Sequence, residues 1–173
     1  MLIPVNEYAR RLSFSPHTVR RIHAALRRAL GQALRWDFYE GDDYHTAANK
    51  AKMASGAPLT DADRRPWLAS LSALVGEVIR QNGHAVLACS ALKAAYRDAL
   101  IPDGAPRGAV RFVFLNVPRA ELEKRLTHRK HFFPASLLDS QLETLEVPQD
   151  AVTVDGTRPI PEIVTGVRNA LHV

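Results

Sequence analysis

Strand-type and helix-type segments alternate along most of this 173-residue chain. Short apolar runs predict strands at residues 36–40, 85–89, 110–117 and 151–154. Apolar residues at spacings of three and four predict helices that begin near residues 15, 60, 94, 118, 137 and 161. The helix near residue 60 has a capped start, with Thr60 and Asp63 as a capping box next to Asp61. An apolar stripe follows from Trp67, interpreted as a core residue, to Ile79. Strands separated by helices usually form a parallel sheet that is covered on both faces. The sequence therefore predicts an α/β fold with three layers, helix, sheet and helix.

Composition narrows the class of protein. A hydrophobic content of 46% and a charged content of 24% are typical of one soluble globular domain. No apolar run approaches the roughly 18 residues of a membrane span, and the first residues lack the order of a secretory signal. Cys89 is the only cysteine, which excludes an intramolecular disulfide. We therefore expect a cytoplasmic protein that does not bind membranes.

The positive charge is concentrated at the N-terminus. Residues 1–36 hold seven arginines and one glutamate, a net charge of +6, whereas the remainder has 16 basic and 17 acidic side chains, a net charge of −1. This basic segment fits either a nucleic-acid contact or a solvated, arginine-rich helix face.

Polar residues follow two predicted strands at their carboxyl ends, where ligands bind in parallel α/β sheets. Asp42 and Asp43 follow the first strand, and Ser90 follows the second. A turn that carries His45, Asn49 and Lys52 is predicted after the two aspartates. One aspartate can accept the proton of an attacking hydroxyl, while the other, for which we favour Asp42, helps to hold magnesium. The alternative is a solvated turn that caps the next helix. Ser90 can offer its hydroxyl to a substrate, and this convergence predicts an active site.

Basic side chains near these strand ends suit an acidic substrate. Arginine offers a planar fork for a carboxylate, and lysine offers a point charge. The predicted substrate-binding residues are therefore His45, Lys52, Arg64, Ser90, Lys93 and Arg97. Each basic residue taken alone also fits a surface charge, and His45 alone fits a surface or packed histidine.

A later basic segment can contact a nucleotide. Arg125, Arg129 and His131 lie where a lid could close over transferred phosphates, whose charge arginines stabilise. The alternative is a basic helix end that complements the helix dipole. No zinc, EF-hand or Ser-His-Asp spacing is present in the sequence.

Several strings resemble the gluconokinase family, a group of P-loop kinases similar to shikimate kinase. They span about residues 27–171 and read FYEGDDYH at 38–45, GAPLTDADRRPWL at 56–68, CSALK at 89–93, YRD at 96–98 and SLLDSQLETLE at 136–146. The resemblance implies ATP-dependent phosphorylation of D-gluconate to 6-phosphogluconate, with ATP and Mg²⁺ as cofactors. It also implies a cytoplasmic enzyme of a family that is often dimeric, so that a homodimer is possible. The family's sugar-acid site maps onto Asp42, Asp43, His45, Lys52, Arg64 and Arg97, and its lid onto Arg125 to His131.

The N-terminal segment departs from this family pattern. Family members begin with an apolar strand and a GxxGxGK[ST] loop, whose amides and lysine hold the phosphates. Counting back from Trp36 places that loop near residues 16–25, which contain no glycine, lysine or serine. We therefore divide the chain into a divergent segment, 1–26, and a kinase body, 27–173. The first strand and phosphate loop are predicted to be degenerate, and gluconate phosphorylation weak or absent.

Two alternatives remain for the function. Without a phosphate loop, the chain would be a catalytically impaired gluconate-binding protein. Residues 6–26 also resemble a helix-turn-helix, in which Thr18, Arg20 and Arg21 would be exposed on a recognition helix. No third helix completes a DNA-binding unit, so we do not expect nucleic acid to be the main partner.

Overall fold

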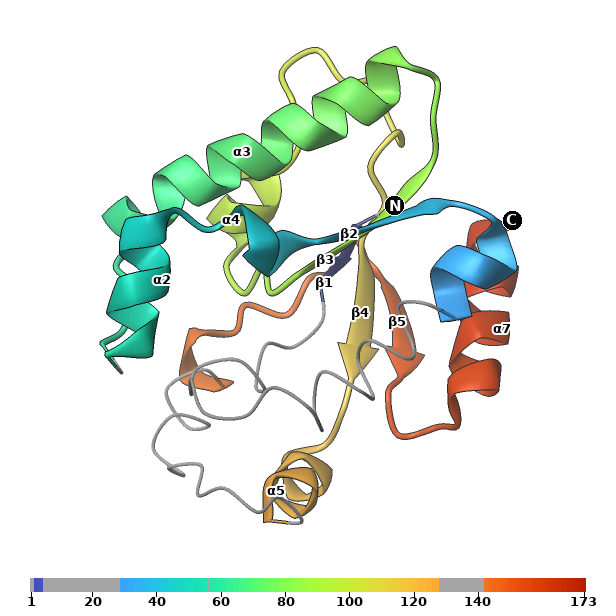
Figure 1. The fold of residues 1–173 in the computed structure, drawn as a ribbon. Coiled ribbons are helices and arrows are strands. Elements are labelled where there is room, and N and C mark those ends of the chain that lie inside the picture. Colours follow the sequence, from blue (N-terminus) through green and yellow to red (C-terminus); the bar gives the residue numbers. More distant parts are fainter. Residues whose placement is uncertain (1, 5–28, 56, 128–141) are drawn as a thin grey trace.

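The computed structural model describes residues 2–4, 29–55, 57–127 and 142–173 (Figure 1). Several predictions fall outside these residues: the helix-turn-helix at 6–26, the replaced phosphate loop at 16–25, the starts of the helices near residues 15 and 137, and the lid residues Arg129 and His131. The boundary proposed at residue 26 also lies there.

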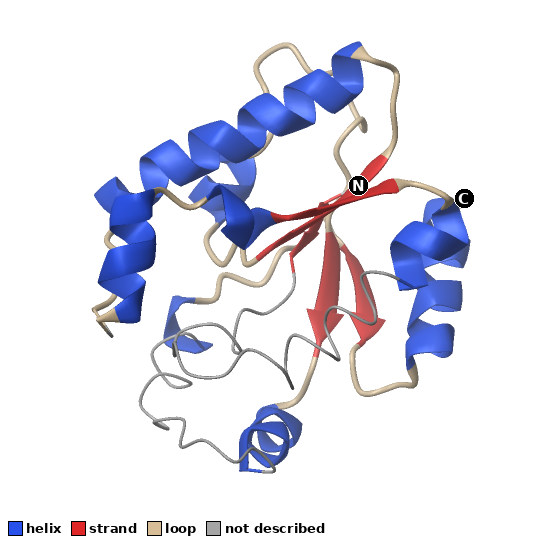
Figure 2. Ribbon diagram, viewed as in Figure 1, coloured by secondary structure: helices blue, strands red, loops and turns tan. Residues whose placement is uncertain are grey.

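In the part of the chain that the structure describes, five strands form the centre of the molecule, as a three-stranded and a two-stranded parallel sheet (Figure 2). β3 (Ala85–Cys89) pairs on one side with β2 (Asp37–Glu40) and on the other with β1 (Leu2–Pro4). β4 (Val113–Asn116) pairs with β5 (Val152–Asp155), and β1 also contacts β4. The order across the structure is therefore β2-β3-β1-β4-β5. The four predicted strands are confirmed, although β4 is shorter than predicted. β1 is a first strand of three residues that pairs with β3, where the sequence predicted a degenerate strand.

Helices connect the strands. They are residues 29–34, α2 (Ala47–Ala54), α3 (Asp61–Arg80), α4 (Ala94–Ala99), α5 (Arg119–Thr127) and α7 (Ile160–Leu171), and residues 142–144 are also helical. The capping box predicted at the start of α3 is confirmed, since Thr60 and Asp63 exchange hydrogen bonds. The turn predicted to carry His45, Asn49 and Lys52 is wrong beyond residue 46, because Thr46 caps α2 there.

Apolar side chains of alternating residues pack on the two faces of the sheet. Leu87 and Cys89 of β3 face α3 and α4, where Trp67 and Leu71 complete a buried cluster. Val86, between them in sequence, packs on the opposite face with Val167 of α7 and Leu30. Helices therefore cover both faces, which confirms the three-layer prediction (Figure 1). Among the described residues, no helix is long and apolar enough to cross a membrane.

Arg35 ends the helical segment 29–34 in a left-handed conformation, with a φ of 56°. Its side chain is exposed, so the backbone conformation dominates its contribution to stability. Residues other than glycine pay roughly 1–2 kcal/mol in this region, because Cβ approaches the carbonyl oxygen. We expect Arg35→Gly to raise the free energy of unfolding in urea by about 1 kcal/mol. Arg35→Ala should give no such gain, and equal stability of the two variants would contradict the assignment.

Candidate active site

The two predicted catalytic aspartates lie in a short 3-10 helix, η1 (Gly41–Tyr44), directly after β2. Glu40 of β2 is in register with Ala88 of β3, so η1 and Ser90 follow neighbouring strands at the same edge of the sheet. Asp42 is half-buried and Asp43 is exposed, whereas Ser90 is buried. Lys50 donates a hydrogen bond to the backbone oxygen of Asp43 at 2.9 Å. The predicted convergence of Asp42, Asp43 and Ser90 at one sheet edge is therefore observed.

His45 is held in a defined orientation. Its ring is only 6% exposed and stacks on Trp67, with 4.4 Å between centroids and 15° between planes. The Trp67 indole N–H also donates to the backbone oxygen of Gly41 at 2.7 Å. One buried side chain of α3 thus contacts both the histidine and the start of η1. His45 is a packed residue beside the aspartates, and a role toward a substrate hydroxyl stays a prediction.

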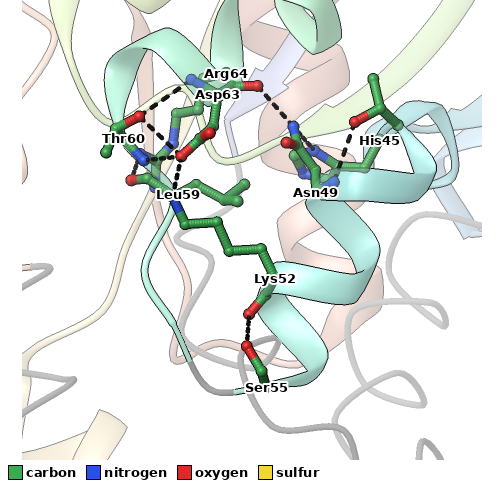
Figure 3. Close-up of polar contacts among 9 residues, drawn as sticks. His45, Asn49, Lys52, Ser55, Leu59, Thr60, Asp63 and Arg64 are labelled. Atoms are coloured by element: carbon green, nitrogen blue, oxygen red, sulfur yellow. Dashed lines mark hydrogen bonds and ion pairs between the residues drawn. The ribbon is translucent and has the colours of Figure 1, made fainter.

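Asn49 and Lys52 of α2 fasten this helix to the start of α3 (Figure 3). The Asn49 amide donates to the backbone oxygen of Asp63 at 2.7 Å and lies 3.5 Å from Nδ1 of His45. The Lys52 ammonium contacts the Asp63 carboxylate at 2.6 Å. Lys52 therefore already has an anionic partner, which a substrate carboxylate would have to replace.

The lowered pKa of Asp63 leads us to predict that the free energy of unfolding decreases at acid pH. The hydrogen bond from Lys52, and then those from Thr60, hold the pKa of Asp63 well below its usual 3.8. Since the pKa is lower in the folded state, the carboxylate stabilises the fold above about pH 3.8, and that contribution is lost as the pH falls further. We expect Asp63→Asn to be less stable than the parent at pH 7 and the difference to shrink towards pH 3. Urea unfolding across this range tests it, and a constant difference would contradict it.

A second group of charged residues surrounds Tyr96 of α4. The Arg64 guanidinium lies 5.7 Å, and the Lys93 ammonium 5.4 Å, from the centroid of the Tyr96 ring. Asp61 accepts hydrogen bonds from the Tyr96 hydroxyl and, at 2.9 Å, from Lys93. The pKa of Asp61 is lowered by these two bonds, Tyr96 first, and that of Lys93 is raised by Asp61. The side chains of Arg64 and Lys93, which are far apart in sequence, thus lie beside the same ring. A site that binds a carboxylate requires such neighbouring cations.

The Arg97 side chain is buried and holds the backbone of a nearby turn by hydrogen bonds. It is 8% exposed, and one guanidinium nitrogen donates to the backbone oxygens of Ala91 at 3.0 Å and Leu92 at 3.1 Å. Ala91 has a φ of 38°, which is unusual for a residue other than glycine. The guanidinium therefore stabilises a strained turn after β3, and binding of a substrate carboxylate by Arg97 stays a prediction.

The nucleotide side of the prediction is described only in part. Arg125 lies on α5, but the structure does not describe its side chain. No group of three or more His, Cys, Asp or Glu side chains suited to a metal occurs within the described ranges. Magnesium in kinases is commonly bound by one or two carboxylates together with substrate phosphates. A single half-buried carboxylate such as Asp42 fits that requirement.

Five contributors to this arrangement were not predicted as site residues: Asn49, Asp61, Asp63, Trp67 and Tyr96. Asp61 and Asp63 were taken only as capping residues, and Trp67 only as core. The contact between Asp61 and Lys93 could not be predicted from their spacing, because the two residues are 32 positions apart in the sequence.

No protein-family model matches the chain. It is 47% identical over 139 residues to a gluconokinase of Gluconobacter oxydans, covering 78% of this chain and 76% of the relative. A gluconokinase structure from Sinorhizobium meliloti matches with a TM-score of 0.72 and 41% identity, covering 86% of this chain and 84% of that one. Shikimate kinase from Aquifex aeolicus matches with a TM-score of 0.61 at 12% identity, over 99% and 95% of the chains, and supports the fold alone. These relationships and the parallel α/β fold show that the chain belongs to the gluconokinase family of P-loop kinases.

Proposed function

We propose that this protein binds D-gluconate at the carboxyl edge of β2 and β3 and phosphorylates it with ATP to 6-phosphogluconate. The observation that supports the proposal is that η1, which carries Asp42 and Asp43, contacts α3 and β3, the elements that place Arg64 and Lys93. η1 contacts both α3 and β3, while Arg64 and Lys93 lie over the same Tyr96 ring. A polyhydroxylated acid needs this combination, acceptors for its hydroxyls and cations for its carboxylate.

The aspartates would act on the hydroxyl that attacks the phosphate. The carboxylate of Asp43 is exposed to solvent and would accept the hydroxyl proton, while Asp42 would hold magnesium. Bound magnesium would neutralise charge on the transferred phosphate. His45, fixed against Trp67, would hydrogen-bond another hydroxyl, and Ser90 lies at the same edge.

The cations would orient the other end of the substrate. Arg64 is half-buried, and one of its guanidinium nitrogens donates to the backbone oxygen of Leu59. Lys93 is bound to Asp61, which keeps its ammonium in place beside the Tyr96 ring. Together with Arg97 at the turn after β3, these groups would hold the substrate carboxylate. Lys52 would contribute by giving up its ion pair with Asp63 for one with the substrate.

We further propose that turnover is low. The segment that should hold the phosphates, residues 16–25, contains no glycine and no lysine, and His23 and Ala24 stand where a phosphate loop has its lysine and its serine or threonine. Hydrogen bonds to charged groups contribute about 1.5–3 kcal/mol each, so losing two or three would weaken ATP binding by several orders of magnitude. Gluconate binding depends on other residues and would persist.

Three measurements separate the proposed substrate from the proposed impairment. Calorimetry with gluconate should give saturable binding, whereas calorimetry with MgATP should give weak binding or none. A coupled assay for ADP should show little turnover. Absence of gluconate binding would overturn the proposed substrate, and ordinary turnover would overturn only the proposed impairment.

A substitution at Arg64 tests the substrate site itself. Arg64→Gln should weaken gluconate binding at least tenfold, because it removes a charged donor to the carboxylate. Arg65→Gln is the matched control, since the neighbouring arginine is exposed, and it should bind gluconate like the parent. Equal affinities of the two variants would show that the acid does not bind at Arg64.

A further inference from the structure

A large hollow lies at the opposite edge of the sheet from the aspartates. It has a volume of about 720 Å³ and is bounded by the C-terminal half of α3, the first residues of β2 and β3, residues 108–111 and the end of α7. Because Asp42 and Ser90 follow the carboxyl ends of the same strands, this hollow is separate from the candidate active site. Its volume falls within the range of roughly 300–1,000 Å³ that small-molecule sites have.

The hollow leaves part of an apolar helix face incompletely covered. The sequence predicts one continuous buried stripe along α3, but only its first half is buried, at Trp67, Leu68 and Leu71. The second half, Leu74, Val75, Val78 and Ile79, is half-buried and lines the hollow. Protein interiors are normally close-packed, so an apolar wall beside a space of this size is suited to an apolar guest.

The remaining walls indicate the chemistry of that guest. Trp36 and His84 stack with 5.1 Å between centroids and 21° between planes, which gives one flat aromatic wall. At the rim, Arg111 is exposed and its guanidinium lies close to Gly108. Among the described residues, no carboxylate side chain lines the hollow and none forms an ion pair with Arg111. Of the described side chains that line the hollow, Arg111 is therefore the one with a permanent charge, and the interior is aromatic and aliphatic.

We propose that this hollow is a second ligand site, which binds a small aromatic anion. The ring system would lie between the aliphatic face of α3 and the Trp36–His84 wall. The anionic group of the ligand would form an ion pair with Arg111. Because Arg111 is exposed, the charge of the ligand would remain in contact with solvent. This site is independent of gluconate binding and of the nucleotide.

The proposal is tested with 8-anilinonaphthalene-1-sulfonate, an aromatic sulfonate whose fluorescence rises in apolar sites. The full-length protein should bind one equivalent saturably, while it retains a cooperative thermal transition. Arg111→Gln should weaken binding about tenfold, because it removes a charge-assisted contact. Arg107→Gln is the matched control, as this exposed arginine in the same loop does not line the hollow, and it should leave the affinity unchanged.

Two further comparisons locate the probe. Val78→Trp should fill the hollow and reduce binding at least tenfold; if that variant does not fold, Ala109→Trp obstructs the space from an exposed lining position. The uncharged analogue N-phenyl-1-naphthylamine should bind the parent and Arg111→Gln proteins equally. Sulfonate binding that is unaffected by the filling variant, or that responds equally to Arg111→Gln and Arg107→Gln, would overturn the proposal, as would failure to bind saturably.

Discussion

A Trp67→Phe protein is expected to fold but to bind gluconate at least tenfold more weakly than the parent. Phenylalanine keeps an aromatic ring in a position that is 1% exposed, so most of the apolar contact is retained. It removes the N–H that donates to the backbone oxygen of Gly41. Leaving a buried acceptor without that donor costs about 1–3 kcal/mol. The start of η1 would then be less firmly placed, and Asp42 and Asp43 with it.

Truncation of the same side chain should have a larger effect. Trp67→Ala removes the ring that stacks on His45 and a central member of the cluster between α3 and the sheet. Large-to-small substitutions of this kind cost about 3–5 kcal/mol, a large part of the stability of a small domain. Urea unfolding should show this loss, and calorimetry should show no gluconate binding.

Trp36→Phe is the control for the phenylalanine variant. Trp36 also stacks on a histidine, His84, but at the other edge of the sheet. The same chemical change there should lower stability slightly and leave gluconate affinity unaltered. If the two phenylalanine variants bound gluconate equally, Trp67 would be a core residue without influence on the site.

The alternation of strand and helix patterns was sufficient to predict the fold, because burial on both faces leaves continuous apolar runs such as β3. Two elements had no such pattern. β1 is three residues long, too short for any period to appear. α2 is held by polar contacts of Asn49 and Lys52 with the start of α3. Its only local signals were the capping Thr46 and several alanines, both typical of helices.

The sequence identified charged residues of the site but not their partners. Asp42, Asp43, Arg64 and Lys93 were recognisable because they follow strand ends or lie in family-like strings. Their geometry depends on tertiary packing, which brings Asp61 of α3 to Tyr96 of α4 and to Lys93, the residue before α4. Apolar periodicity also explains why Trp67 was taken as core: a buried indole and an indole that orients a neighbour give the same pattern. Only the N–H contact to Gly41 distinguishes them.

Gly41 should be the most sensitive backbone position of the candidate site. A Cβ atom added there would lie 2.5 Å from the backbone oxygen of Ala88 in β3 and 3.5 Å from Leu71 Cδ1. β3 is the buried strand between β1 and β2 and cannot easily move, so the strain falls on Gly41 and η1. We expect Gly41→Ala to lower the free energy of unfolding by about 3 kcal/mol. Because Asp42 and Asp43 would be displaced, gluconate binding should also be lost, and calorimetry measures this loss.

Gly76→Ala provides the contrast, because it adds the same methyl group where space exists. Gly76 lies inside α3, and its added Cβ would meet Pro102 at 3.6 Å, an ordinary contact. Alanine is favoured over glycine within helices by roughly 0.5–1 kcal/mol, so this variant should be at least as stable as the parent. It should also bind gluconate normally. A Gly41→Ala protein that matched it in stability and affinity would show that η1 and β3 can separate without cost, and the close approach that positions the aspartates would then have no functional importance.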